Sequence, residues 1–143
     1  MAAALGLDRR SGTRNGVQNP VQQQLPAGLR VLLAEDEPLI AMDGEAVLRG
    51  MGVQLVVLAR SVSEGLNAIA SSTPDAAFLD LRLGADTSVP LAERLAQAGV
   101  PFAFLTGYQG DAIPPTFKDR PVVAKPFTPD LLLQALLAMV PKR

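Results

Sequence analysis

Five short apolar runs, separated by longer amphipathic segments, constrain the fold of this chain more than any other feature of its sequence. Runs that are this short and continuously apolar are typical of strands buried on both faces. A sheet with one face in water would instead alternate apolar and polar residues along each strand. The runs are rich in Val, Leu and Phe and span residues 29–34, 53–59, 75–81, 101–106 and 121–125.

Amphipathic segments with a helical period fill the gaps between these runs. The fourth of them is interrupted by Pro114 and Pro115. Since proline inside a helix costs about 3 kcal/mol, this helix should be short or irregular. Strand followed by helix, five times over, predicts an α/β fold with a doubly wound, five-stranded parallel sheet and helices on both faces. The helical segments cover residues 38–51, 61–72, 87–98, 110–118 and 128–140.

Several residues mark the expected helix ends. Ser61, with Glu64 three residues on, resembles a capping box at the start of a helix. Thr128 stands before an apolar run in a position suited to an N-cap. Gly52 and Gly99 lie where helices would end in a left-handed residue.

The chain length of 143 residues suits one domain. Residues 1–28 are rich in Gly, Gln and Asn and have neither a strand nor a helix period, so we predict a flexible extension followed by a domain over 29–143. No apolar run reaches the roughly 18 residues that span a bilayer, and the N-terminus has no signal-peptide core. We therefore expect a cytoplasmic protein without a membrane partner.

The composition excludes several function classes. With no cysteine and no histidine, the chain has no disulfide, no thiolate or imidazole metal ligand, and no catalytic triad that uses histidine. A net charge of −1 gives no reason to expect nucleic-acid binding.

Polar side chains stand at the ends of four predicted strands. In an open parallel sheet, ligands bind at the edge where the strands end. Residues from distant parts of the sequence are therefore expected to meet at one rim. They are Glu35, Asp36 and Glu37 after the first strand, Asp80 after the third, Thr106 after the fourth and Lys125 after the fifth.

Carboxylates gathered in a partly desolvated site raise one another's pKa unless a cation lies between them. Mg²⁺ resolves this conflict, because it prefers oxygen ligands and keeps positions for water or a phosphoryl group. Asp80 could then act as a nucleophile and become an aspartyl phosphate. Lys125 and the Thr106 hydroxyl would be suitable donors to the added phosphoryl oxygens. Each residue taken alone could instead be an ordinary loop residue, helix cap or ion-pair partner.

The segments "LLAEDEP", "FLDLRLG", "FLTG" and "AKPF" together resemble the response-regulator receiver domain of bacterial two-component signalling. The resemblance covers residues 29–140 and implies a flavodoxin-like fold. It also implies a phosphorylatable signalling domain rather than an enzyme. The expected phosphoryl donor is a histidine kinase or a phosphotransfer protein.

The resemblance assigns roles to most residues of the rim. Glu35 and Asp36 match the acidic pair, with Asp36 as the direct Mg²⁺ ligand, and Asp80 matches the phosphoacceptor. Arg82 would lend its backbone carbonyl to the metal. Thr106 matches the switch hydroxyl, and Lys125 matches the family's lysine, which a cis peptide bond joins to Pro126.

Two features depart from the common pattern. The aromatic residue expected three positions before the lysine is replaced by Val122, whereas Tyr108 follows the switch threonine. This arrangement resembles a subset of often stand-alone receivers with a Phe-x-Thr-Gly-Tyr motif. Tyr108 could be the moving aromatic or plain surface packing.

The last helix, "PDLLLQALLAMV", is apolar nearly all round, which suggests a partner surface or a homodimer unless the helix is deeply packed. No output module follows it, so we expect output through protein contacts or a role as a phosphate sink. Two alternatives remain open. One is a Mg²⁺-dependent phosphoester hydrolase with Asp80 as nucleophile, although Arg82 replaces its usual companion acid. The other is a receiver-like scaffold that is never phosphorylated.

Overall fold

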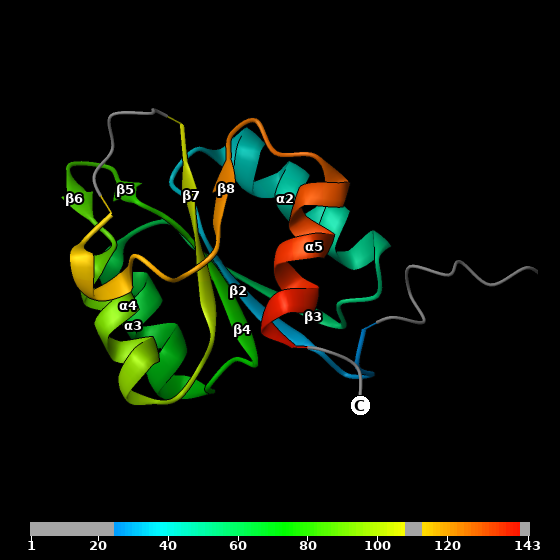
Figure 1. Cartoon of the computed structure of the whole chain (residues 1–143), viewed down its shortest axis with the longest axis horizontal. Coiled ribbons are helices and arrows are strands. Elements are labelled where there is room, and N and C mark those ends of the chain that lie inside the picture. The colour runs from blue at the N-terminus through cyan, green and yellow to red at the C-terminus, as the bar shows by residue number, and fades with distance from the viewer. Residues whose placement is uncertain (1–24, 108–112, 141–143) are drawn as a thin grey trace, which may run out of the picture.

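A single parallel sheet forms the centre of the protein (Figure 1). The computed structural model describes residues 25–107 and 113–140. The sheet has five strands in the order β3-β2-β4-β7-β8, and all neighbouring pairs are parallel. This is the predicted doubly wound sheet. The strands are β2 (Arg30–Ala34), β3 (Leu55–Ala59), β4 (Ala76–Asp80), β7 (Phe102–Thr106) and β8 (Val122–Ala124).

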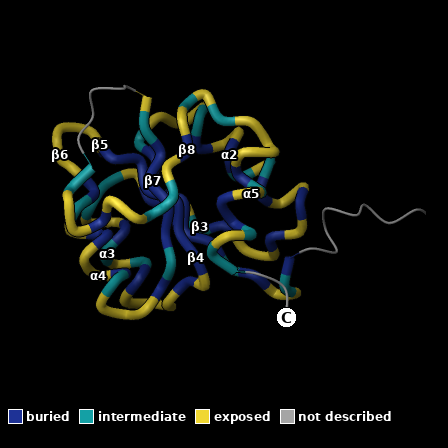
Figure 2. Tube along the Cα trace, in the orientation of Figure 1, coloured by how far each residue is buried: buried dark blue, intermediate teal, exposed yellow. Residues whose placement is uncertain are grey.

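Helices cover both faces of the sheet, as predicted. On one face, α2 (Pro38–Gly50) and α5 (Pro129–Met139) lie side by side, and on the other α3 (Val62–Ser71) packs with α4 (Val89–Gln97) (Figure 1). The dark blue of buried residues in Figure 2 follows the strands and the inner sides of these helices. None of the helices in the described ranges is long and apolar enough to cross a membrane.

Alternation along the strands produces two cores, one on each face. In β7, Phe102 and Phe104 belong to the core under α3 and α4, whereas Ala103 and Leu105 belong to the core under α2 and α5. All four side chains are fully buried. Because both faces are buried, the strand sequence is continuously apolar, as a covered parallel sheet requires.

The predicted helix ends are confirmed. The backbone N–H of Glu64 donates to Ser61 Oγ at 3.1 Å, and Glu64 accepts in return from the N–H of Arg60 at 2.8 Å. Leu131 N–H donates to Thr128 Oγ1 at 3.2 Å. The two glycines after α2 and α4, at positions 52 and 99, have φ of 108° and 73°.

The segment before β8 contains only a short 3₁₀ helix, η2 (Pro115–Phe117), within the described residues 113–121. This confirms the expectation of a short or irregular fourth helix. Phe117 anchors the segment on the sheet, because its ring lies 5.4 Å from that of Phe102 in an edge-to-face contact. The guanidinium carbon of Arg120 lies 4.3 Å from the centre of the Phe102 ring, which adds a cation–π contact.

A two-stranded antiparallel ribbon after β4 was not predicted. It pairs β5 (Arg82–Leu83) with β6 (Asp86–Thr87), and Gly84 turns the chain with φ of 62°. Strands of two residues are too short for their periodicity to be recognised in a sequence. The glycine between them was the one available signal.

The described chain begins at Leu25, whose side chain is buried in the core under α2 and α5. Packed chain therefore starts before residue 29, where the domain was predicted to begin. Residues 1–24 of the predicted extension lie outside the described residues.

Helix α5 packs most of its apolar side chains on the core. Leu132, Ala135 and Leu136 are buried, and Leu133 and Leu137 are partly buried against the same cluster. Packing within the domain therefore accounts for most of the apolar character that suggested a partner. A homodimer through this helix stays a prediction.

We expect Gly65→Ala to destabilise the fold. An added Cβ would lie 2.6 Å from Leu91 Cδ2, where α3 meets α4, and overpacking of this kind costs about 1–3 kcal/mol. Gly50→Ala is the matched control, because its Cβ would meet no described heavy atom within 4 Å. Urea denaturation measures both variants. Equal stability of the two variants would contradict a tight contact between α3 and α4.

Candidate functional site

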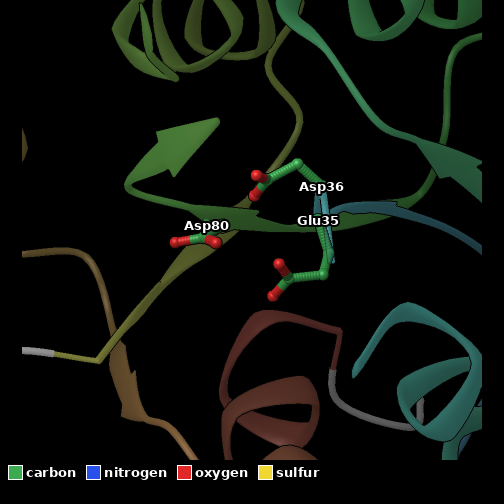
Figure 3. A group of neighbouring side chains, drawn as sticks. All are labelled: Glu35, Asp36 and Asp80. Atoms are coloured by element: carbon green, nitrogen blue, oxygen red, sulfur yellow. The ribbon is translucent and has the colours of Figure 1, made fainter. Parts of the chain in front are cut away.

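Three carboxylates meet at the carboxyl ends of β2 and β4 (Figure 3). The two strands are adjacent and in register, with Ala34 beside Leu79. The residues that follow these positions are therefore neighbours. One ligand oxygen from each of Glu35, Asp36 and Asp80 lies within 4.8 Å of the others. The structure thus gathers the acids that the sequence placed at two separate strand ends.

The three acids differ in exposure. Glu35 and Asp80 are buried, at 1% and 6% relative exposure, whereas Asp36 is half-buried. Glu35 is held inward, because its Oε2 accepts the N–H of Glu37 at 3.1 Å just before α2 begins. Asp80 Oδ1 accepts the N–H of Arg82 at 3.3 Å. Backbone donors therefore fix the orientation of both buried carboxylates.

Lys125 lies between the two buried acids. Its Nζ donates to Asp80 Oδ2 at 2.8 Å and to Glu35 Oε1 at 3.0 Å. The Lys125 backbone N–H donates to the carbonyl of Thr106 at 2.9 Å, so the ends of β7 and β8 are joined at this point. Charge-assisted hydrogen bonds of this length are stronger than neutral ones. The ammonium group therefore links residues from the first, third and fifth strands in chain order.

Burial and charge shift two ionisation equilibria at the site. Burial raises the pKa of Glu35, and the nearby Asp80 charge adds to this effect, while hydrogen bonds from the Glu37 N–H and Lys125 partly offset it. Burial opposes the charge of Lys125, but its hydrogen bonds to Asp80 and Glu35 outweigh burial and raise the pKa of Lys125. Lys125 is therefore a cation throughout the neutral pH range.

A pocket of about 160 Å³ opens onto these groups. Its size suits a hydrated cation together with a group such as phosphoryl. The carboxylate oxygens fit a hard divalent cation such as Mg²⁺, which keeps several waters when it binds to proteins. Glycine at positions 84 and 107 adds no side chain to the pocket wall. The lining residues are Asp36, Glu37, Asp80, Arg82, Gly84, Gly107 and Lys125.

The remaining residues of the predicted site are also placed by the structure. Thr106 is the last residue of β7 and is half-buried beside Lys125. The peptide bond between Lys125 and Pro126 is cis, as the resemblance implied. Position 122 carries a valine instead of an aromatic residue, and this valine is 49% exposed and therefore not turned into the core. Tyr108 lies outside the described residues, and the Phe-x-Thr-Gly-Tyr subset stays a prediction.

Sequence reasoning missed the structural surroundings of the acids. It did not foresee that the β5–β6 ribbon forms one wall of the pocket through Arg82 and Gly84. It also missed the backbone bond from the Glu37 N–H that turns Glu35 inward. The spacing of "EDEP" gave no signal for that bond, because it depends on the chain direction at the start of α2.

Comparison with known proteins identifies similar response regulators, although not through a family model. No protein-family model matches the chain. The phyllosphere-induced regulator PhyR of Methylorubrum extorquens is 35% identical over 107 residues, which are 69% of this chain and 39% of the relative. The chain thus spans well under half the length of that curated relative.

Two solved structures extend the comparison. SdrG from Sphingomonas melonis Fr1 superposes with a TM-score of 0.72 at 40% identity, covering 80% of this chain and 98% of that one. The response regulator PhyR from Brucella abortus has a TM-score of 0.68 at 29% identity, over 85% of this chain and 50% of that one. Fold, site geometry and these similarities agree. The chain belongs to the response-regulator receiver family.

Proposed function

We propose that this chain is a phosphoryl-accepting receiver in which Asp80 takes a phosphoryl group from a phosphohistidine donor in a Mg²⁺-dependent reaction. The observation that carries the proposal is the position of Lys125, whose ammonium group bonds both buried acids, Glu35 and Asp80, at 3.0 and 2.8 Å. A cation beside a buried aspartate can pair with phosphoryl oxygens once the aspartate is modified.

The reaction needs one bond exchange. An Asp80 carboxylate oxygen forms a P–O bond while the P–N bond of the donor phosphohistidine breaks. The electron pair stays on the imidazole nitrogen, which takes a proton from solvent. Lys125 and the Thr106 hydroxyl are the proposed donors to the transferred oxygens. Lys125 would then bond the phosphoryl oxygens in place of the Asp80 carboxylate.

Glu35, Asp36, Asp80 and the Arg82 carbonyl are the proposed holders of Mg²⁺, with Asp36 and Asp80 as direct carboxylate ligands. The bound cation would supply positive charge beside the transferring oxygens. The buried Glu35 orients the site through Lys125 and the Glu37 N–H. The half-buried Asp36 lies on the side open to the pocket.

The proposed donor is a histidine kinase or a phosphotransfer protein. Output would follow through protein contacts, or the domain would serve as a phosphate sink. A stand-alone role is supported by the coverage of SdrG, of which the chain matches nearly the whole length. The hydrolase alternative is less favoured, because the residue two positions beyond Asp80 is Arg82, which cannot act as a general acid at neutral pH.

Intact-mass spectrometry after incubation with acetyl phosphate tests the proposal. We expect one added phosphoryl group in Mg²⁺ and none in EDTA. Acetyl phosphate is the first donor, because it needs no cognate kinase. If neither acetyl phosphate nor a phosphohistidine protein modifies the chain, the proposal is wrong. Continuous phosphate release from phosphoesters would support the hydrolase instead.

We expect Mg²⁺ to stabilise the folded protein. A ligand at about 100 times its Kd adds about 2.7 kcal/mol to the free energy of unfolding, and the carboxylate cluster exists only when β2 and β4 are paired. Thermal denaturation with increasing Mg²⁺ measures the effect. Asp36→Asn should weaken it, and Asp130→Asn, on the exposed start of α5, should not. The same response in both variants would place the cation elsewhere.

A further inference from the structure

The described backbone directly after Lys125 makes few hydrogen bonds that could hold it in place. Strand β8 has three residues, and the Lys125 N–H donates the hydrogen bond that reaches the carbonyl of Thr106. Pro126 follows and has no N–H to donate. A long side chain at the end of so short a strand needs another contact to hold its backbone in place.

Phe127 provides that contact through a notch in α2. Its side chain packs against the core under α2 and α5. A Cβ added to Gly44 would lie 3.2 Å from Phe127 Cζ and 2.8 Å from Leu33 Cδ2. Gly44 is buried in the middle of α2, where glycine is otherwise unfavourable. The missing side chain therefore leaves a space that the tip of the Phe127 ring shares with Leu33 Cδ2.

Phe127 also stands at the entry to α5. Thr128 caps this helix by accepting the N–H of Leu131. Phe127 thus precedes the N-cap, and the buried Leu132 stands at the fourth helical position. This is the spacing of a hydrophobic staple, which fixes the direction in which a chain enters a helix. Both residues pack in the same core cluster.

We propose that Phe127, seated against Gly44, is a positioning residue that holds Lys125 Nζ between Asp80 and Glu35. The ring fixes the backbone two residues beyond Lys125, and the Thr106 carbonyl fixes it at Lys125 itself. The effect on phosphorylation rests on the function proposed above. The effect on the position of the ammonium group does not.

The two hydrogen bonds of Lys125 allow its Nζ only a small displacement. Nζ has to reach Asp80 Oδ2 at 2.8 Å and Glu35 Oε1 at 3.0 Å together. A displacement of about 1 Å lengthens at least one of these bonds beyond hydrogen-bonding distance. Misplacement of a transition-state donor on this scale is expected to slow the reaction about tenfold or more.

The first test reads the lysine ammonium directly by ¹H–¹⁵N NMR of the full chain in EDTA. The sequence contains three lysines, Lys118, Lys125 and Lys142. The ammonium signal of Lys125 should be protected from exchange by its two carboxylate partners, and its loss in Lys125→Met assigns it. We expect this signal to be lost or exchange-broadened in Phe127→Ala and in Gly44→Ala.

A compensating pair of substitutions distinguishes a loss of lysine positioning from a general loss of core packing. Leucine lacks the Cζ atom that would lie 3.2 Å from the Cβ of an alanine at position 44, and Leu33 Cδ2, at 2.8 Å, is the end of a flexible side chain that can turn away. Gly44→Ala with Phe127→Leu should therefore restore the Lys125 signal. Leu137→Ala is the matched control. It removes partly buried apolar volume from the same cluster at a position on α5 that the proposal does not use, and it should keep the signal.

The second test measures the rate of phosphoryl uptake from acetyl phosphate at saturating Mg²⁺. We expect about a tenfold loss for Phe127→Ala and recovery in the double variant relative to Gly44→Ala. If wild-type protein accepts no phosphoryl group, the proposed function fails, and the ammonium signal still decides the role of Phe127. The proposal is overturned if Phe127→Ala keeps a protected Lys125 signal, or if Leu137→Ala loses it equally.

Discussion

Asp80→Asn will abolish phosphoryl uptake from acetyl phosphate, while the protein stays folded. The carboxylate is the proposed attacking group, and an amide at the same place is not a comparable nucleophile. The substitution conserves size, and its carbonyl oxygen can keep the hydrogen bond from the Arg82 N–H, which is 3.3 Å from Asp80 Oδ1. Intact mass measures uptake, and urea denaturation measures folding.

The fold of Asp80→Asn should change little for an electrostatic reason. Lys125 loses one carboxylate partner at 2.8 Å but keeps Glu35 at 3.0 Å, and the repulsion between the two acids disappears. We expect the free energy of unfolding to change by no more than about 1 kcal/mol. Asp130→Asn serves as the control and should accept a full phosphoryl group. Uptake by Asp80→Asn equal to that of this control would place the acceptor at another residue.

Lys125→Met will slow phosphorylation by about 100-fold or more, which is the usual cost of removing a donor that stabilises transition-state charge. In EDTA it will also destabilise the protein, because the side chains of Glu35 and Asp80 are 0% and 9% exposed and lose the cation between them. Removing one partner of a buried pair costs about 3 kcal/mol or more. Kinetics by intact mass and urea denaturation measure the two effects.

Two comparisons identify the cause of this destabilisation. Mg²⁺ should recover more stability in Lys125→Met than in the wild type, because the cation supplies the charge that the lysine no longer provides. Adding Glu35→Gln to Lys125→Met removes one unpaired buried carboxylate and should also recover stability. If neither change recovers stability, packing rather than charge explains the loss.

Much of the fold could be predicted, because a strand that is buried on both faces has a continuously apolar sequence. Each predicted strand matches an observed one to within two residues at either end, and the four long helices are found where their periodicity placed them. The irregular fourth helix followed from Pro114 and Pro115. The ribbon of β5 and β6 was missed, because two-residue strands carry no periodic signal.

The sequence by itself determined which chemistry this chain can gather. Parallel strands send their carboxyl ends to one rim, so the order of acids, threonine and lysine along the chain implies a site without knowledge of the tertiary structure. Tertiary structure decided how those groups meet. Lys125 bonds residues 45 and 90 positions away, and Phe127 reaches the notch at Gly44 only when α2 packs beside α5. Such contacts depend on distances between elements, which local sequence patterns do not encode.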